Sequence, residues 1–277
     1  MLVTADTLLL DAQKNGYAVG AFNIENMEMA QAVVEAVSSL GAPAILQTTP
    51  STVRYGGAQL LGAIMRTAAE TAKSPIAVHL DHGDGFGMAM QALRAGYTSI
   101  MIDGSQLDFE ANIALSARVV EAAKPNGVPV EAELGKVGGK EDDTESENAY
   151  TDPAEAAEFV KRTGVDSLAI GIGTAHGIYK GEPKLDLDRL SEIRAAVDIP
   201  LVLHGASGIS EAMLTECIHR GISKINFATE LRVAYSDGVK AALAKNPNVF
   251  DPKIYGTAGR DSVREAVLRL CRICMKG

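Results

Sequence analysis

Short apolar runs recur along the chain, each bounded by turn residues. Most of these runs are apolar at nearly every position, which predicts strands covered on both faces, as in a parallel sheet. The eight runs cover residues 17–23, 43–49, 76–82, 99–105, 128–134, 167–173, 200–207 and 224–230.

Segments with helical periodicity lie between these runs, and several begin with a capping residue. Asp152 precedes Pro153, and Ser210 precedes Glu211, both of which are typical of helix starts. The predicted helices include residues 27–40, 58–73, 109–123, 153–163, 188–197 and 210–220. Eight alternating β and α units predict an α/β fold that closes into one (β/α)₈ TIM barrel.

The region after Glu230 predicts extra C-terminal helices: one long helix, a loop over residues 246–255 and a closing helix over 261–275. A barrel of this kind often has about 250 residues. No linker or low-complexity segment divides the 277 residues. We therefore expect residues 1–277 to form a single TIM-barrel domain.

The composition argues against some classes of function but does not identify the function. The chain has 26 Lys plus Arg against 35 Asp plus Glu, a net charge of −9, which argues against broad nucleic-acid binding but not against a local anion site. No apolar stretch approaches the roughly 18 residues of a membrane span. The first residues carry Asp6 and Asp11 and no basic region, so we expect no secretory signal and a cytoplasmic location.

The three cysteines, Cys217, Cys271 and Cys274, are a poor basis for a disulfide framework and agree with a reducing compartment. The Cys-x-x-Cys pair lies in the last predicted helix without a redox context, and we expect it to be structural.

The longest stretch without predicted structure covers residues 135–150, after the fifth strand. Gly135, Gly138 and Gly139 give it hinges, and its acidic run keeps it solvated. A loop of this length in a compact domain is usually functional or mobile, which favours an active-site lid.

Polar residues collect where the predicted strands end, which is the face of a TIM barrel that carries active sites. Four of the five histidines lie in or beside these ends. The strand-end residues are Asp81, His82, Asp103, Ser105, Glu131, Glu133, His176, His204, Ser207 and Asn226.

Three of the histidines, His82, His176 and His204, can converge from the third, sixth and seventh strands. Three imidazoles with an open coordination position form a catalytic Zn²⁺ site, although three separately hydrogen-bonded histidines would have the same spacing. We expect His79 to support or pack beside the site, and His219 to lie on the surface or pack.

Asp81 and His82 are adjacent, so an ideal strand would send their side chains to opposite faces. Both can enter one site only if the strand ends or bulges there. Glu131 and Glu133 have the same parity and point to the same side, toward the barrel interior or mouth.

Two small-residue loops follow the seventh and eighth strands, where TIM barrels commonly bind phosphate. The first comprises Gly205, Ala206, Ser207 and Gly208, and the second comprises Asn226, Phe227, Ala228 and Thr229. Small residues expose backbone N–H groups, and the Ser and Thr hydroxyls add donors.

Six motifs at these strand ends together resemble the class II, zinc-dependent ketose-bisphosphate aldolases. They are HLDH at 79–82, VEAELG at 130–135, GGKEDD at 138–143, GTAHG at 173–177, LHGASG at 203–208 and KIN at 224–226. The similarity extends from residue 17 to the Asp251-Pro252 loop. Ala228 stands where the fructose-bisphosphate enzymes typically have Asp, so the chain looks closer to the tagatose-bisphosphate subgroup.

The resemblance implies reversible aldol cleavage of a ketose 1-phosphate or 1,6-bisphosphate to dihydroxyacetone phosphate and a three-carbon aldehyde. It implies Asp81 as the acid/base at the C4 hydroxyl and Glu141, in the lid, as the residue moving a proton on dihydroxyacetone phosphate. The implied Zn²⁺ ligands are His82, His176 and His204, with Glu133 and Asp103 near an auxiliary metal position. The implied substrate-binding residues are Asn23, Thr49, Gly177, Gly205, Ala206, Ser207, Asn226, Phe227, Ala228 and Thr229, with a monovalent cation, Na⁺ or K⁺, nearby.

The family pattern also implies a homodimer or homotetramer, because an Arg after the Asp-Pro of the C-terminal loop usually reaches the distal phosphate of a neighbouring subunit. Here that position is Lys253, which cannot form the bidentate contact of Arg. Arg54 and Arg260 could compensate. The identity of the group at C6 therefore stays open: it can be a phosphate, a sulfonate or another group. Sulfofructose 1-phosphate and a deoxy-keto-gluconate phosphate are candidate substrates of the latter kinds.

Two other classes compete with an aldolase. A metal-dependent hydrolase on the same barrel would not need the phosphate loops that Ser207 and Asn226 predict. A non-catalytic barrel subunit should have lost ligands, whereas Asp81, Glu141 and the three histidines are all present. Neither alternative involves a membrane or nucleic acid.

Overall fold

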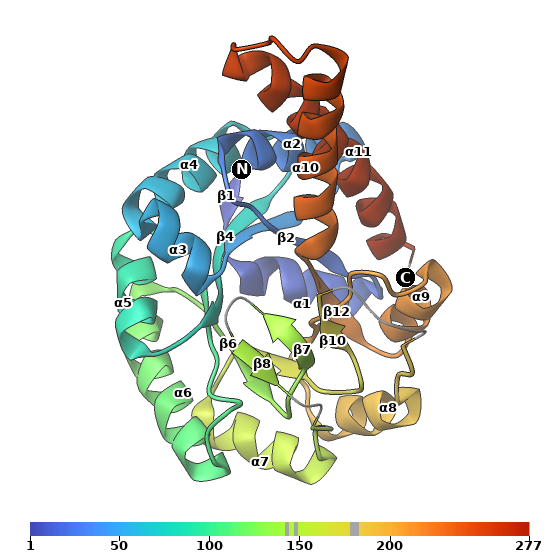
Figure 1. Cartoon of the computed structure of the whole chain (residues 1–277). Coiled ribbons are helices and arrows are strands. Elements are labelled where there is room, and N and C mark those ends of the chain that lie inside the picture. Colours follow the sequence, from blue (N-terminus) through green and yellow to red (C-terminus); the bar gives the residue numbers. More distant parts are fainter. Residues whose placement is uncertain (142–143, 147–148, 178–182, 277) are drawn as a thin grey trace.

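The computed structural model describes residues 1–141, 144–146, 149–177 and 183–276. Within these ranges, eight parallel strands close into a barrel in the order β2–β3–β4–β5–β6–β9–β11–β12, and β12 pairs back with β2 (Figure 1). The predicted α/β barrel is confirmed. The strands are β2 (Val19–Asn23), β3 (Ala44–Thr48), β4 (Ile76–Gly83), β5 (Ser99–Ile102), β6 (Val130–Leu134), β9 (Ser167–Ile170), β11 (Leu201–Leu203) and β12 (Ile222–Phe227), and β1 (Leu2–Val3) pairs beside β4.

The helices surround this barrel, and several of them begin at side-chain caps that the sequence encodes. Asp152 accepts hydrogen bonds from the N–H groups of Ala154 and Glu155 at 2.8 and 3.0 Å, which confirms the predicted start. The helices are α1 (Ala5–Asn15), α2 (Met27–Leu40), α3 (Pro50–Gly56), α4 (Ala58–Thr71), α5 (Phe86–Arg94), α6 (Phe109–Ala123), α7 (Pro153–Thr163), α8 (Leu187–Ala196), α9 (Glu211–His219), α10 (Thr229–Lys245) and α11 (Pro252–Cys274).

The C-terminal helices are present, but the predicted start of the closing helix at 261 is wrong. Helix α11 begins at Pro252, because Asp251 caps it through a hydrogen bond from the Lys253 N–H group at 3.0 Å. Pro is well suited to the first helical position, where its missing N–H costs nothing. The loop between α10 and α11 is therefore shorter than expected.

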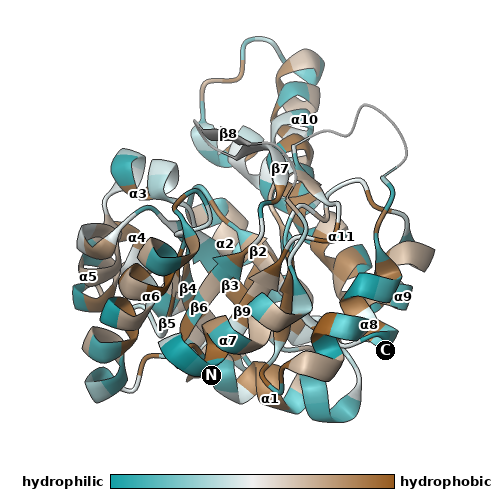
Figure 2. Ribbon diagram, turned by 90° about the horizontal axis from the view of Figure 1, so that it is seen from below, coloured by the Kyte–Doolittle hydropathy of each residue, from teal (hydrophilic) through white to brown (hydrophobic). Residues whose placement is uncertain are grey.

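The barrel interior is layered because alternate residues of each strand point inward. At the amino-terminal end, Leu8 and Leu9 of α1 join an apolar cluster with inward residues of the strands, including Val19 and Ala77. Figure 2 shows α1 across this end, opposite the β7–β8 hairpin. Apolar residues thus close one end of the barrel, and its polar residues lie above them.

The apolar run that predicts the eighth strand, residues 224–230, misplaces the start of that strand. The eighth apolar run starts at Lys224, which would place this side chain at the amino-terminal face. Strand β12 begins two residues earlier, at Ile222, so Lys224 lies within the strand and its side chain is 0% exposed.

The predicted structureless stretch after β6 contains regular structure. Strand β7 (Gly138–Glu141) pairs with β8 (Thr144–Ser146) in an antiparallel hairpin, and β7 also pairs with β10 (Ala175–His176). This hairpin therefore lies directly beside the segment that carries one of the predicted metal ligands.

The three cysteines are buried and free, and His219 is exposed, as expected. No helix in the described part of the chain is long and apolar enough to cross a membrane.

Candidate functional site

A small hollow opens at the carboxyl ends of the barrel strands, and sequence-predicted residues line it throughout. They come from the ends of β2, β4, β11 and β12 and from the segment around β10. The lining comprises Asn23, Asp81, His82, His176, Gly177, Gly205, Ala206, Ser207, Asn226, Ala228 and Thr229.

The three predicted metal ligands converge beside this hollow, and His82 and His176 line it. The ring centroid of His82 lies 5.0 Å from that of His176 and 4.5 Å from that of His204, and the last two are 6.2 Å apart. Each ring offers one nitrogen such that the three nitrogens lie within 4.8 Å of one another. Closure of the barrel thus brings together three residues that are far apart along the chain.

His82 enters the site because the strand is irregular at that residue. Its φ angle is +48°, in a region that non-glycine residues rarely occupy, and the pairing of β4 with β5 shifts register between Leu80 and Gly83. This irregularity lets Asp81 and His82 face the same hollow, as their adjacency required.

Carboxylates hold two of the three imidazoles. Asp103 lies 2.9 Å from His82 Nδ1, and Glu133 lies 3.0 Å from His204 Nδ1. Donor atoms of His82, Asp103 and Glu133 also lie within 4.8 Å of one another, forming a second candidate metal group that shares His82. Imidazole nitrogens with carboxylate neighbours are a donor set that suits a divalent transition metal.

The charges of the site also fit a cation. Asp81, Glu131 and Glu133 are each 2% exposed, and Lys224 is the buried ammonium among the described residues around them. Buried carboxylates are costly unless they are paired or coordinate a metal. The residues present therefore fit a bound divalent metal.

Two amides bracket the carboxylate of Asp81. Asn23 donates to Oδ2 and Asn226 donates to Oδ1, both at 2.8 Å, and Gln47 donates to Asn23 Oδ1 at 2.8 Å. Burial alone would raise the pKa of Asp81, but His82, His204 and Lys224 lower it to about 2. Asp81 is therefore a fixed carboxylate at neutral pH, with both oxygens aligned.

Below the histidines lies a buried polar network. Lys224 Nζ lies 2.8 and 3.0 Å from the two Glu131 carboxylate oxygens and 3.5 Å from His79 Nε2. His79 Nδ1 lies 2.7 Å from the Ser99 hydroxyl. Burial and the Lys224 charge lower the pKa of His79 to about 3, so this ring is neutral. His79 thus has the supporting position that its strand parity predicted.

Two predicted substrate-binding side chains lie elsewhere. The Phe227 side chain stacks on Phe22 with centroids 5.7 Å apart, so it faces the apolar core. Thr49 is buried, and its hydroxyl lies 3.3 Å from the Thr52 hydroxyl. Neither side chain lines the hollow.

The predicted cations are paired outside the hollow. Arg54 forms an ion pair with Asp84 at 2.6 Å, and Lys253 forms one with Asp251 at 2.9 Å. The side chain of Glu141 lies outside the described residues, although its backbone pairs with Thr144 in the hairpin.

Sequence reasoning missed a polar cluster near the mouth. Glu25 accepts hydrogen bonds from the Thr52 hydroxyl at 2.6 Å and from Arg232 Nε at 2.7 Å. Glu25 lies two residues beyond Asn23, a predicted site residue, and this spacing is the signal by which the sequence could have identified Glu25.

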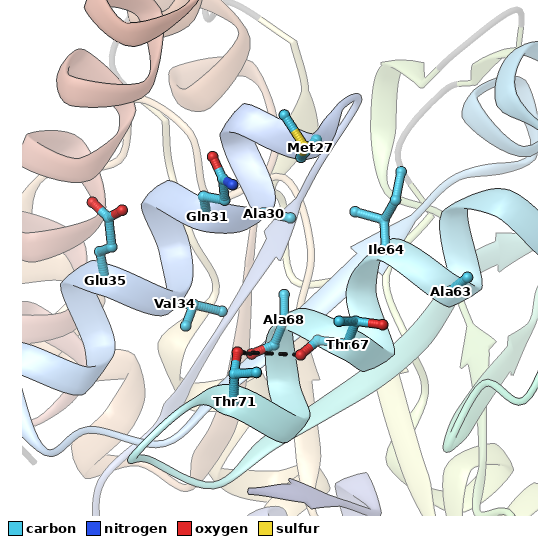
Figure 3. A pocket seen from close by; sticks show the side chains of 10 residues that line it. All are labelled: Met27, Ala30, Gln31, Val34, Glu35, Ala63, Ile64, Thr67, Ala68 and Thr71. Carbon is cyan, nitrogen blue, oxygen red and sulfur yellow. Dashed lines mark hydrogen bonds between the residues drawn. The ribbon is translucent and has the colours of Figure 1, made fainter.

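A wider groove of about 580 Å³ lies between α2 and α4 on the outside of the barrel (Figure 3). It is lined by Met27, Ala30, Gln31, Val34, Glu35, Ala63, Ile64, Thr67, Ala68 and Thr71. None of the sequence-predicted site residues belongs to this lining, so the groove is separate from the site.

Histidines and carboxylates at the strand ends of a TIM barrel are typical of a metal-dependent enzyme. Comparison with known proteins identifies this enzyme as an aldehyde-lyase. The family model for class-II fructose-bisphosphate aldolase matches residues 3–277, and the chain belongs to this family. It is therefore an aldolase, and its family acts on sugar phosphates.

Solved structures agree with this assignment. The YdjI aldolase from Escherichia coli K12 is 36% identical, with 99% of this chain and 97% of that chain covered and a TM-score of 0.88. A putative fructose-1,6-bisphosphate aldolase from Coccidioides immitis is 29% identical, with 97% and 94% covered and a TM-score of 0.90. The fructose-bisphosphate aldolase from Campylobacter jejuni shares the fold at 21% identity, with 99% and 96% covered and a TM-score of 0.83.

Proposed function

We propose that this chain is a zinc-dependent aldolase that reversibly cleaves a ketose 1-phosphate or 1,6-bisphosphate of the fructose or tagatose series. The products would be dihydroxyacetone phosphate and a three-carbon aldehyde. The observation that carries the proposal is the convergence of His82, His176 and His204 beside a buried Asp81 whose two oxygens are both fixed.

The three histidines would hold Zn²⁺, and Glu133 and Asp103 would provide an auxiliary metal position. When bound, zinc supplies Lewis-acid polarisation of the substrate carbonyl. The donor set described above supports this assignment, and a monovalent cation, Na⁺ or K⁺, would accompany the phosphate.

Asp81 would move the proton of the C4 hydroxyl. Because its pKa is about 2, it is a carboxylate at neutral pH and can accept this proton as the C3–C4 bond breaks. In the synthetic direction it returns the proton. The amides of Asn23 and Asn226 hold the accepting oxygens in place, and the Asn226 Oδ1 atom, which lacks a partner among the described residues, is available to a substrate hydroxyl.

The strand-end loops would bind the phosphate of dihydroxyacetone phosphate. Gly177, Gly205, Ala206, Ser207, Ala228 and Thr229 line the hollow. Helix α10 begins at Thr229, so its N-terminal N–H groups favour an anion there. Gly205 has a φ of +65°, and a Cβ on it would lie 2.7 Å from the Ala175 carbonyl oxygen, so only glycine lets these loops meet.

Glu141 would move a proton at the dihydroxyacetone phosphate carbon from a lid formed by the hairpin segment. The pairing of β7 with β10 supports this, because it brings the hairpin beside His176. A closed lid would exclude water from the reacting atoms.

The C6 end of the substrate would be recognised at the mouth, with Arg54 and with Lys253 from a neighbouring subunit of a cytoplasmic homodimer or homotetramer. Lys253 is 85% exposed and pairs locally with Asp251. A Lys in place of Arg favours, as a second candidate, the same cleavage of a ketose 1-phosphate whose C6 end is a sulfonate or carboxylate.

A cleavage assay tests the function directly. The zinc-loaded enzyme would be given the 1,6-bisphosphates of fructose and tagatose, sulfofructose 1-phosphate and a deoxy-keto-gluconate phosphate, and the substrates ranked by kcat/KM. Release of dihydroxyacetone phosphate from at least one of them is expected. Failure with all of them would overturn the proposed substrate class.

A further inference from the structure

Lys224 is a fully buried lysine one layer below the metal-binding histidines. Its side chain is 0% exposed, and the carboxylate of Glu131 that it contacts is 2% exposed. Removing an ammonium and a carboxylate from water costs several kcal/mol per ion unless their geometry is good. An apolar residue would fill this layer of the barrel at lower cost, as Met101, Ala169 and Val202 do elsewhere in the interior.

Three polar contacts, with atoms of Glu131 and His79, hold Lys224 in place. Both Glu131 oxygens lie within 3.0 Å of its Nζ atom, and His79 Nε2 lies at 3.5 Å. His79 is itself held by Ser99, which lies 2.7 Å from its other nitrogen. The ammonium therefore fixes where the carboxylate of Glu131 lies.

Glu131 in turn contacts His204, a predicted metal ligand. Its Oε1 atom lies 3.0 Å from His204 Nε2, and Glu133 lies 3.0 Å from the opposite ring nitrogen, Nδ1. The two carboxylates differ in one respect. Glu133 belongs to a candidate metal group with His82, whereas Glu131 belongs to neither of the candidate groups found among the described residues.

This difference identifies the nitrogen of His204 that faces the metal. A nitrogen that coordinates a metal must keep its lone pair, and a metal-bound histidine usually donates its other N–H to a carboxylate. Nε2 faces Glu131, outside both candidate groups, so Nε2 carries the proton. Nδ1 faces Glu133, which shares a candidate metal group with His82.

We propose that Lys224 and Glu131 are positioning residues for the metal site: Lys224 anchors Glu131, Glu131 accepts the Nε2–H of His204, and this presents the Nδ1 lone pair to the metal. The inference rests on the metal dependence in the proposed function. Neither residue touches the substrate or the reacting atoms. An ion pair that served only folding would leave the metal affinity unchanged.

Zinc affinity and the state of the His204 ring test this role without relying on activity. The full chain would be compared with Glu131→Gln, Lys224→Met and the double variant, with Ser99→Ala as a control that alters the far end of the network. Zinc dissociation constants would be measured by competition with a chromophoric chelator. Thermal unfolding of the metal-free proteins would measure the effect on folding separately.

Both single variants should weaken zinc binding by about 10- to 100-fold, the range found for partners of metal-bound histidines. The double variant should bind zinc more tightly than Lys224→Met, because the amide carbonyl introduced by Glu131→Gln can still accept the Nε2–H when no charge is left unpaired. Ser99→Ala should stay within about twofold of the unchanged chain, since it does not contact Glu131 or His204. In ¹H–¹⁵N spectra of the zinc-loaded chain, the His204 ring should show a protonated Nε2 and a metal-bound Nδ1.

Zinc binding unchanged in both single variants would show that the pair serves folding alone, and a metal-bound Nε2 would overturn the assignment of the ring. If Lys224→Met does not fold, Glu131→Gln, which keeps the shape of the side chain, decides the question. If the unchanged chain binds no zinc, this inference and the proposed metal dependence both fail. If it binds zinc and the variants bind equally well, only this inference fails.

Discussion

Gly139 of the β7 strand pairs in register with His176 of β10, so the hairpin backbone lies against a predicted metal ligand. A Cβ at position 139 would lie 2.3 Å from the His176 carbonyl oxygen, and the φ of Gly139 is +84°. The hairpin can approach the site this closely only because residue 139 has no side chain.

Replacing Gly139 with Ala should therefore displace either the hairpin or His176. A shift of about 1 Å near reacting groups can cost about 10²-fold in rate, and we expect a loss of this size in kcat/KM. Gly127→Ala is the matched control, because Gly127 has a φ of +64° and nothing within 4 Å of its Cβ position. Equal activity of the two variants would show that the contact with His176 is unimportant.

Asp81→Ala should lower turnover by about 10²- to 10⁴-fold, because it removes the group proposed to exchange the C4 proton. Zinc content should stay near one ion per chain, since the three histidines remain. Turnover and metal content would be measured on the same preparation. Loss of zinc together with activity would instead identify Asp81 as a ligand.

Chelation with EDTA should abolish cleavage, and Zn²⁺ should restore it, because the metal supplies the electron sink. Treatment with borohydride in the presence of substrate should leave no covalent adduct on the protein by mass spectrometry. An adduct would indicate a Schiff base and would contradict the proposed chemistry.

His79 predicts how acid affects the metal-free chain. Its pKa is about 3 in the folded protein and near 6.5 when unfolded, so between these values the unfolded state binds a proton that the folded state does not. Stability from this residue is therefore lost as pH falls below about 6.5. Between pH 7 and pH 5, the free energy of unfolding of the unchanged chain should fall by about 2 kcal/mol relative to His79→Gln. Denaturant unfolding of both chains at the two pH values would measure these free energies. If the difference between the two chains is the same at pH 7 and pH 5, the prediction is contradicted.

Lys253→Ala should raise KM about tenfold for substrates with a charged C6 group, the scale of a lost hydrogen bond to a charged group. It should have little effect on analogues uncharged at C6. Lys245→Ala, on the exposed end of α10, is the control. An equal effect on charged and uncharged substrates would refute a role in C6 recognition.

Much of the site is predictable because it obeys strand periodicity. The parity of Glu131 and Glu133 places both inside the barrel, and the need for an irregular strand at Asp81 and His82 is confirmed by the φ of His82. The apolar pattern misplaces Lys224 because the run that it defines starts two residues late. Apolar runs locate strands well but their ends poorly, since here the polar Ser223 separates Ile222 from the rest of the run.

The sequence by itself determined the barrel, its eight strands and the strand ends that carry chemistry, because burial on both faces leaves a local pattern of apolar residues. Only the tertiary structure decided which of those residues meet. His204 contacts Glu131 and Glu133, and Lys224 contacts Glu131, across 73, 71 and 93 positions of the chain. Such contacts depend on barrel closure and on the register between strands, neither of which any local stretch of sequence encodes.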